Sequence, residues 1–247
     1  MSKFFVNAQQ IDIENKCISI VGEDVNHMKN VLRASVGTQV TLCDGEGFDY
    51  PGTITQIEKN KILVAYEDKI ACDTEPQYAI TLYQGVAKGE RMDQLIQKCV
   101  ELGITRIVPV LCARTVVKFH SEKDAVSKVE RWQKIAGEAA KQCNRGVIPE
   151  VCMPVRFSEA IAQAKDTPIK LIPYEEEKEN TIKQFISGLE KPDETAYFIG
   201  PEGGFAPEEV ALACDNGFTP ITLGKRILRT ETAGPAVLAI FRCFFED

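Results

Sequence analysis

Short apolar segments separated by polar turns dominate the first 72 residues of the chain. Residues 40–43, 48–57 and 61–66 alternate between apolar and polar positions or run apolar, as half-buried strands do. Asp44-Gly45 lies between the first two of these segments, and Asp-Gly is a strong hairpin signal. Residues 24–32 instead place apolar side chains at helical spacing. The N-terminal part is therefore expected to be β-rich with one helix.

The pattern changes after residue 78 to apolar runs that alternate with helix-like segments. Strands are predicted over residues 79–86, 107–111, 169–173, 196–200 and 221–223, and helices over 90–102, 121–143, 181–187, from Pro207 onward and over 232–245. Such alternation over a long segment predicts a mostly parallel sheet covered by helices on both faces. The polar segment 71–77 contains Pro76, so we expect a domain boundary there, with domains at 1–72 and 73–247.

Composition narrows the class of protein. Of the 247 residues, 44% are hydrophobic and 26% are charged, which is ordinary for a globular protein. No apolar run approaches the roughly 20 residues that span a bilayer, and the N-terminal apolar patch is too short for a signal peptide, so a cytoplasmic location is expected. The 9 cysteines are scattered without C-x-x-C spacing and there are only 2 histidines, which argues against a disulfide framework and against a metal site.

Charge is segregated along the chain. The net charge is −7, yet residues 85–145 carry 12 Lys and Arg against 7 Asp and Glu, whereas residues 150–215 carry 6 against 14. A basic block within an acidic protein can form a surface that faces phosphates. A solvated helix rich in lysine also explains the block, and on charge alone this second interpretation is favoured.

Two motifs near the C-terminal end carry the clearest chemical signal. FIGPEGGF at residues 198–205 and LGKRILRTETAGPA at 223–236 each run from an apolar strand into a glycine-containing turn and then into a helix-like segment. Glycine lets a ligand approach the backbone, and ligands bind at the carboxyl ends of parallel strands. The two turns therefore predict one composite pocket for a small molecule, with tight turns required only by the fold as the alternative.

Other common motifs do not account for these turns. The P-loop, the Rossmann glycine pattern and the G-x-S-x-G elbow are absent. The segment Asp44-Gly45-Glu46-Gly47 lies in the β-rich part with no helix after it, so a hairpin turn explains it better than a cofactor loop.

The motifs resemble those of the ribosomal RNA small subunit methyltransferase E family, within the SPOUT superfamily. FIGPEGGF and LGKRILRTETA carry the resemblance, and KGERMDQLIQKCVELGI, RWQKIAGEAAKQCNR, the N-terminal FFV and HMKNVLR extend it over nearly the whole chain. The chain departs from the family at Lys3, where the family usually has Arg before the Phe-Phe pair. Lys cannot form the bidentate fork of Arg, so a phosphate contact there is expected to be weaker.

The resemblance implies an α/β fold: a C-terminal α/β-knot (SPOUT) domain with a mostly parallel sheet and a trefoil knot, plus a small N-terminal PUA-like β-barrel domain. It further implies a homodimer that methylates N3 of one uridine in 16S rRNA of the small ribosomal subunit, with S-adenosyl-L-methionine as cofactor. Two alternatives stay open. One is a ribose 2′-O or other base methyltransferase on another RNA, and the other is a non-catalytic RNA-binding protein.

The resemblance also assigns residues. The cofactor cradle is expected to comprise Leu171, Pro173, Ile199, Gly200, Glu202, Gly203, Gly204, Leu223, Gly224, Ile227 and Leu228. Arg229 is the candidate that stabilises the uridine anion, and Glu231 orients it or accepts the proton, although the two can also be a structural ion pair. With the resemblance in hand, the basic block is expected to grip RNA through Lys3, Arg33, Lys88, Arg91, Arg114, Lys118, Arg131, Lys134, Lys141 and Arg145.

Overall fold

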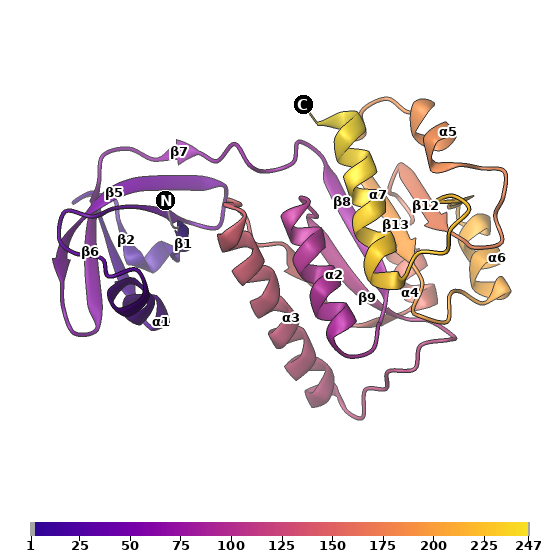
Figure 1. The fold of residues 1–247 in the computed structure, drawn as a ribbon, viewed down its shortest axis with the longest axis horizontal. Coiled ribbons are helices and arrows are strands. Elements are labelled where there is room, and N and C mark those ends of the chain that lie inside the picture. The colour runs from indigo at the N-terminus through magenta and orange to yellow at the C-terminus, as the bar shows by residue number, and fades with distance from the viewer. Residues whose placement is uncertain (1–2, 247) are drawn as a thin grey trace. The chain divides into compact units, whose positions relative to one another are not determined.

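A computed structural model describes residues 3–246 of the chain. The chain forms two compact units (Figure 1). The first holds the residues up to Glu75 together with Ala140–Ile148, and the second holds Pro76–Ala139 together with the residues from Pro149 onward. The N-terminal unit therefore includes a segment that lies far along the chain.

A single sheet organises the first unit. Its strands are β1 (Lys3–Phe5), β2 (Ile11–Asp12), β3 (Cys17–Val21), β4 (Gln39–Cys43), β5 (Phe48–Ile57), β6 (Lys61–Tyr66) and β7 (Ile70–Ala71). They follow the order β1-β4-β5-β6-β3-β2, with β7 beside β5. The predicted hairpin at Asp44-Gly45 is confirmed, because β4 and β5 pair antiparallel. A short 3-10 helix at Ala8–Gln10, α1 (Glu23–Asn26) and the π-helical turn His27–Val31 that continues α1 complete the unit.

The second unit contains a sheet whose strand pairs, within the described residues, are all parallel. Its strands are β8 (Ala79–Gly85), β9 (Arg106–Leu111), β10 (Glu150–Val151), β11 (Val155–Arg156), β12 (Ile169–Pro173), β13 (Glu194–Ile199) and β14 (Thr219–Ile221). The order is β10-β9-β8-β13-β12-β14, with β11 beside β9. The predicted mostly parallel sheet is confirmed.

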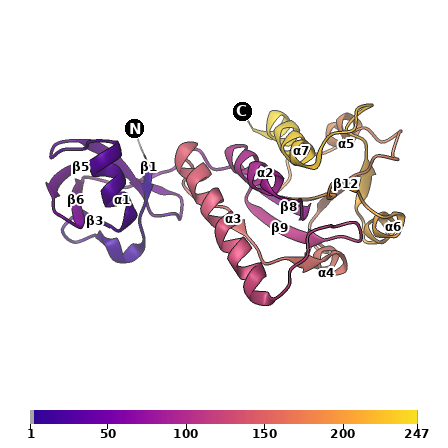
Figure 2. The same cartoon turned by 60° about the horizontal axis from the view of Figure 1, so that its bottom comes forward.

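Helices cover both faces of this sheet (Figures 1 and 2). The helices are α2 (Glu90–Glu101), α3 (Glu122–Gln142), α4 (Phe157–Gln163), α5 (Ile182–Ser187), α6 (Pro207–Asp215) and α7 (Thr230–Phe245). Figure 2 shows α2 and α7 on one face and α4 and α6 on the other.

The alternation of side chains along β13 explains why both faces are buried. Phe198 stacks on Tyr83 of β8, with ring centroids 4.7 Å apart, and packs in one cluster with Phe157 of α4 and Val210 of α6. Its neighbour Tyr197 points to the opposite face and donates its hydroxyl to the carbonyl of Gly234 in α7 at 3.2 Å. Burial of both faces explains why residues 196–199 of the strand form a continuous apolar run.

Two boundaries differ from the sequence prediction in ways that matter for the site. The last strand ends at Ile221 and not at residue 223, so Leu223 and Gly224 leave the sheet and belong to a loop. Helix α7 begins at Thr230, two residues before the predicted start, which puts Arg229 at its N-cap and Glu231 in its first turn. The short elements β10, β11 and α4 were not predicted, because a two-residue strand or a two-turn helix leaves little periodicity to detect.

Candidate functional site

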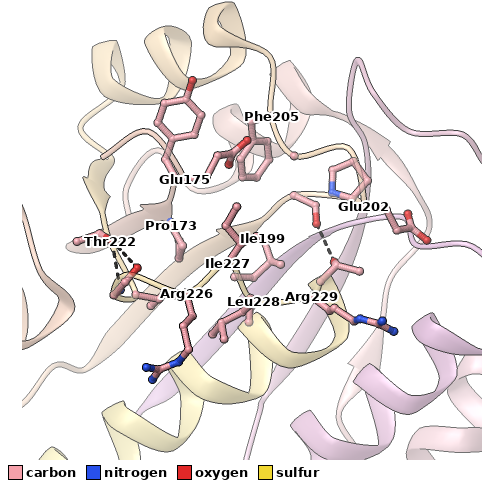
Figure 3. Close-up of a pocket in the computed structure, with 18 of the residues that line it drawn as sticks. Pro173, Glu175, Ile199, Glu202, Phe205, Thr222, Arg226, Ile227, Leu228 and Arg229 are labelled. Carbon is pink, nitrogen blue, oxygen red and sulfur yellow. Dashed lines mark hydrogen bonds between the residues drawn. The ribbon is translucent and has the colours of Figure 1, made fainter. Parts of the chain in front are cut away.

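A cavity of ≈ 930 Å³ lies at the carboxyl edge of the parallel sheet (Figure 3). Its walls come from three loops, which follow β12, β13 and β14, and from the first residues of α2 and α7. The strands β8 and β13 are neighbours, yet the chain leaves β8 toward β9 and leaves β13 toward β14, on the other side. This reversal is a topological switch point, where open α/β sheets hold their ligands.

Glycines bring the walls close together. A Cβ added at Gly200 would lie 3.1 Å from the Cα and carbonyl carbon of Gly204, so these two positions of the loop touch through bare backbone. Gly204 has a φ of +67° and Gly224 a φ of +113°, values that other residues rarely adopt. The conformations of the loop after β13 and of the loop after β14 therefore depend on glycine at these positions.

Behind the loop after β13, Gly85 at the end of β8 makes an equally close contact. A Cβ at this position would lie 2.5 Å from the nitrogen and the Cδ of Pro201, and 2.9 Å from the carbonyl carbon of Gly200. The loop after β13 therefore packs directly against the backbone of β8, and this contact fixes the position of Gly200 and Pro201, which line the cavity.

Hydrogen bonds fix the carboxylate of Glu202, a charged residue in the loop after β13. Its Oε1 accepts hydrogen bonds from the backbone N–H of Lys88 at 2.9 Å and from Nη1 of Arg91 at 2.7 Å. Partial burial acts to raise the pKa of this carboxyl, but the Lys88 amide and the Arg91 guanidinium outweigh it, so the pKa lies below its ordinary value. Glu202 therefore carries a negative charge beside the cavity at neutral pH.

Arg229 and Glu231 lie beside Glu202. Oε1 of Glu231 is 3.9 Å from Nη1 of Arg229 and 3.9 Å from Nε of Arg91, so two guanidinium groups face one carboxylate oxygen. The side chain of Arg229 is 80% exposed, whereas that of Glu231 is 16% exposed. Within the described residues, Oε2 of Glu231 is buried and has no hydrogen-bond partner.

A smaller hollow of ≈ 590 Å³ adjoins the cavity and shares this cluster with it. Its lining is Lys88, Gly89, Glu90, Arg91, Gln94, Arg229 and Glu231. Arg91, Arg229 and Glu231 line both spaces. An exposed cation at the boundary between two spaces can act on a group bound in either of them.

The middle of the main cavity is apolar. Figure 3 shows Ile199, Ile227 and Leu228 lying together there, with the Arg226 side chain directed away from them. The side chain of Ile227 is 87% exposed, an unusual position for a large apolar residue in a folded protein. A flat apolar group in the cavity would cover it.

The predicted cofactor residues converge on this cavity with one exception. Pro173, Ile199, Gly200, Glu202, Gly203, Gly204, Leu223, Gly224, Ile227 and Leu228 all line it. Leu171 does not; it is completely buried within β12, two residues before the carboxyl end of the strand. Pro173, the last residue of β12, lines the cavity instead, because only the end of a strand borders the carboxyl edge of the sheet.

Sequence reasoning missed several lining residues, among them the charged Glu175. Its Oε1 lies 2.5 Å from where a Cβ of Gly204 would be, so it packs against the glycine loop. Glu175 opens a run of three glutamates, which looks like a solvated turn. Its place two residues after the end of β12 was the available signal.

The predicted RNA-binding residues separate into different environments. Lys88, Lys118 and Lys134 are exposed, as is Arg33 in the first unit. Arg114 donates Nη1 to the carbonyl of Gly203 at 3.0 Å, and Arg131 is ion-paired with Asp93. In the first unit, Lys141 lies 3.3 Å from Asp24.

Lys3 and Arg145 are buried inside the first unit. Nζ of Lys3 lies 2.8 Å from Asp49 and donates to the carbonyl of Asn144 at 2.8 Å. Arg145 is 3% exposed, and its Nη2 lies 2.7 Å from Glu75. Both cations hold segment 140–148 in the first unit, so they offer no charge to an external phosphate.

Between residues 3 and 246, no group of three or more His, Cys, Asp or Glu side chains is placed to hold a metal ion. No helix in that part is both long and apolar enough to cross a membrane.

Comparison with known proteins places the fold and the site in one class, the RNA methyltransferases. Residues 74–242 match a family described as RNA methyltransferase domain, and residues 20–65 match one described as RNA methyltransferase PUA domain. A ribosomal RNA small subunit methyltransferase E from Bacillus subtilis is 34% identical, over 94% of this chain and 93% of that protein. The chain belongs to the ribosomal RNA small subunit methyltransferase E family.

Solved structures agree with this placement. Ribosomal RNA small subunit methyltransferase E from Neisseria gonorrhoeae, bound to S-adenosyl methionine, matches with a TM-score of 0.88 at 31% identity and covers 99% of this chain and 98% of that one. A putative methyltransferase from Legionella pneumophila, in complex with the same cofactor, matches with a TM-score of 0.86 at 30% identity and covers 98% and 96%. The family, its RNA methyltransferase domain and the PUA domain expected from the motifs are confirmed.

Proposed function

We propose that this chain transfers a methyl group from S-adenosyl-L-methionine to N3 of one uridine in 16S rRNA of the small ribosomal subunit. The observation that carries the proposal is the glycine-walled cavity at the switch point of the sheet, with the Arg91, Arg229 and Glu231 cluster at its edge. Two similar solved proteins, one of them of this family, hold S-adenosyl methionine, which supports the assignment of the cofactor.

The residues present fit this cofactor. The bare backbone of Gly200, Gly203 and Gly204 permits close approach of a ligand, and the apolar cluster with Ile227 suits the face of an adenine ring. Glu202 carries negative charge beside the cavity, which suits a cofactor with a sulfonium and an ammonium group. The cofactor supplies an electrophilic methyl group, and all the remaining chemistry falls to the protein.

Arg229 supplies the electrostatic part of that chemistry. N3 of uridine carries a proton at neutral pH, and its negative charge spreads to the flanking carbonyl oxygens when the proton leaves. A guanidinium beside those oxygens lowers the pKa of N3 and stabilises the charge that develops as N3 attacks the methyl carbon. Glu231, which is less exposed than Arg229 and faces it at 3.9 Å, orients this guanidinium or accepts the N3 proton.

RNA would be held by cations of the second unit and by the PUA domain. The exposed cations of the second unit are Lys88, Arg91, Arg114, Lys118, Arg131 and Lys134, and the first unit contributes the exposed Arg33 and the partly buried Lys141. The target uridine must leave its stack to reach the cavity, as with other base-modifying enzymes. We further propose a cytoplasmic homodimer, domains at 1–72 and 73–247, and a trefoil knot made by the segments around Gly200 and Gly224 with α7.

The test is methyl transfer by the purified protein to small subunits from a strain that lacks this gene. The product nucleoside is identified by mass spectrometry, and its position by reverse transcription, because an N3 methyl group blocks base pairing. A single 3-methyluridine in 16S rRNA is expected. A ribose-methylated product would replace the proposed target, and RNA binding without any transfer would favour a non-catalytic RNA-binding protein.

A further inference from the structure

A polar chain crosses the apolar interior of the second unit beside the cavity. Gln84, in β8, is completely buried. Its Nε2 donates to Oγ1 of Thr230 at 2.8 Å and to the carbonyl of Gly85 at 2.9 Å. Oγ1 of Thr230 donates in turn to the carbonyl of Gly200 at 2.7 Å. Three segments that are distant in sequence are therefore joined by consecutive hydrogen bonds.

The direction of this chain is fixed by the number of protons. A hydroxyl has one hydrogen to give, and Thr230 gives it to Gly200 while it accepts from Gln84. The Gln84 amide uses both of its N–H groups, on Gly85 and Thr230. Its Oε1 is buried without a hydrogen-bond partner in the described structure and would lie 3.7 Å from a Cβ at Gly234.

Packing does not explain an amide at this position. Leu82, two residues earlier on the same face of β8, is apolar and completely buried. A leucine would fill the layer against α7 without leaving a carbonyl oxygen unpaired, and burial of an unpaired polar atom is unfavourable. The amide is accounted for by the hydrogen bond that it directs at Thr230.

The location of the chain connects it to function. Gly200 begins the loop that carries Glu202, and Thr230 lies between Arg229 and Glu231. Gly200 and Thr230 both line the cavity. The chain also bridges β8 and β13 at the switch point of the sheet. It thus ties the wall formed by the glycine loop to the first turn of α7.

We infer that Gln84 and Thr230 are positioning residues that hold the cofactor loop and the Arg229–Glu231 pair in one fixed geometry. Gln84 orients the hydroxyl of Thr230, and that hydroxyl anchors the carbonyl of Gly200. The inference rests on the proposed function, in which this loop holds S-adenosyl-L-methionine and the pair acts on the uridine. Pre-organisation of both walls before binding is what raises affinity and rate.

The experiment compares Thr230→Val, which keeps the shape but removes the hydroxyl, with Thr230→Ser, which keeps the hydroxyl. The dissociation constant for S-adenosylhomocysteine is measured on the full chain by calorimetry. Thr230→Val should bind about tenfold more weakly, the equivalent of one lost hydrogen bond, and Thr230→Ser should stay within about threefold of the native protein. Thr195→Val is the matched control, because Thr195 is buried in the same unit but its hydroxyl has no hydrogen-bond partner among the described residues. This variant should bind normally.

A second variant keeps the test decisive if Thr230→Val folds poorly. Gln84→Met removes the amide but keeps the length of the side chain, and it should weaken binding by about threefold to tenfold. The double variant should bind no more weakly than Thr230→Val alone, because both changes break one chain. Native affinity in both single variants, or full additivity, would overturn the inference. Failure of the native protein to bind S-adenosylhomocysteine would instead count against the proposed function.

Discussion

Gly85 does not itself line the cavity, yet its substitution by alanine should damage the site through Gly200 and Pro201, which do. The added methyl group would lie 2.5 Å from two atoms of Pro201, its ring Cδ and its backbone nitrogen. Neither can rotate away as a flexible side chain does. To reach 3.4 Å, where ordinary van der Waals contact begins, the Gly200–Pro201 segment must move by about 0.9 Å.

This shift sets the expected magnitude. Overpacking of this kind costs about 1–3 kcal/mol of folding stability, and a displacement near 1 Å of groups that position a reaction can cost about 10²-fold in rate. We expect Gly85→Ala to bind S-adenosylhomocysteine about tenfold more weakly and to transfer methyl groups about 10²-fold more slowly in single turnover. Both are measured at a temperature where circular dichroism shows the variant folded.

Gly188→Ala is the control for the general effect of replacing a glycine. Gly188 has a negative φ of −93° and ends α5, and a Cβ there would come no closer than 3.8 Å to a neighbouring atom. This variant should match the native protein in affinity and rate. If Gly85→Ala also kept native affinity and rate, and lost only stability, the close contact of β8 with the loop would not set the geometry of the site.

Four further predictions concern charge. Arg229→Ala should lower the single-turnover rate by about 10²–10³-fold while the dissociation constant for S-adenosylhomocysteine changes by less than about threefold; equal losses would make Arg229 a binding residue. The pKa of Glu202 is lowered, so its stabilising contribution is complete above the ordinary value of 4.5 and is lost as pH falls through the lower folded pKa. The unfolding midpoint of Glu202→Gln should therefore fall below the native one above pH 4.5 and approach it in acid, and a constant difference would contradict this. Arg145→Met removes one side of a buried ion pair and should lower the free energy of unfolding, measured in urea, by about 3–5 kcal/mol. Arg131→Glu should leave this stability near native but weaken RNA binding and flatten its salt dependence. If Arg145→Met weakened only RNA binding and Arg131→Glu lowered only stability, both assignments would be refuted.

The local sequence determined most of the elements and the place of the pocket. Apolar alternation located β4, β5 and β6, and helical spacing located α2, because these patterns follow directly from the geometry of a strand and of a helix. Strand-to-glycine transitions identified Gly200, Gly204 and Gly224, because a backbone that must approach another group closely tolerates few other residues. The family resemblance then led to the proposed cofactor and substrate, which no periodicity encodes.

Only the tertiary structure decided how distant residues pair. It put β8 beside β13, and this placed Arg91 against Glu202 and Gln84 against Thr230. It also buried Lys3 and Arg145 in ion pairs, although in sequence they look like any other cations of a basic protein surface. The physical reason is that burial and the choice of partner are properties of the packed chain. Whether a charged side chain is available to a ligand or is neutralised by an ion pair depends on its neighbours in space, and these can be more than a hundred residues away in sequence.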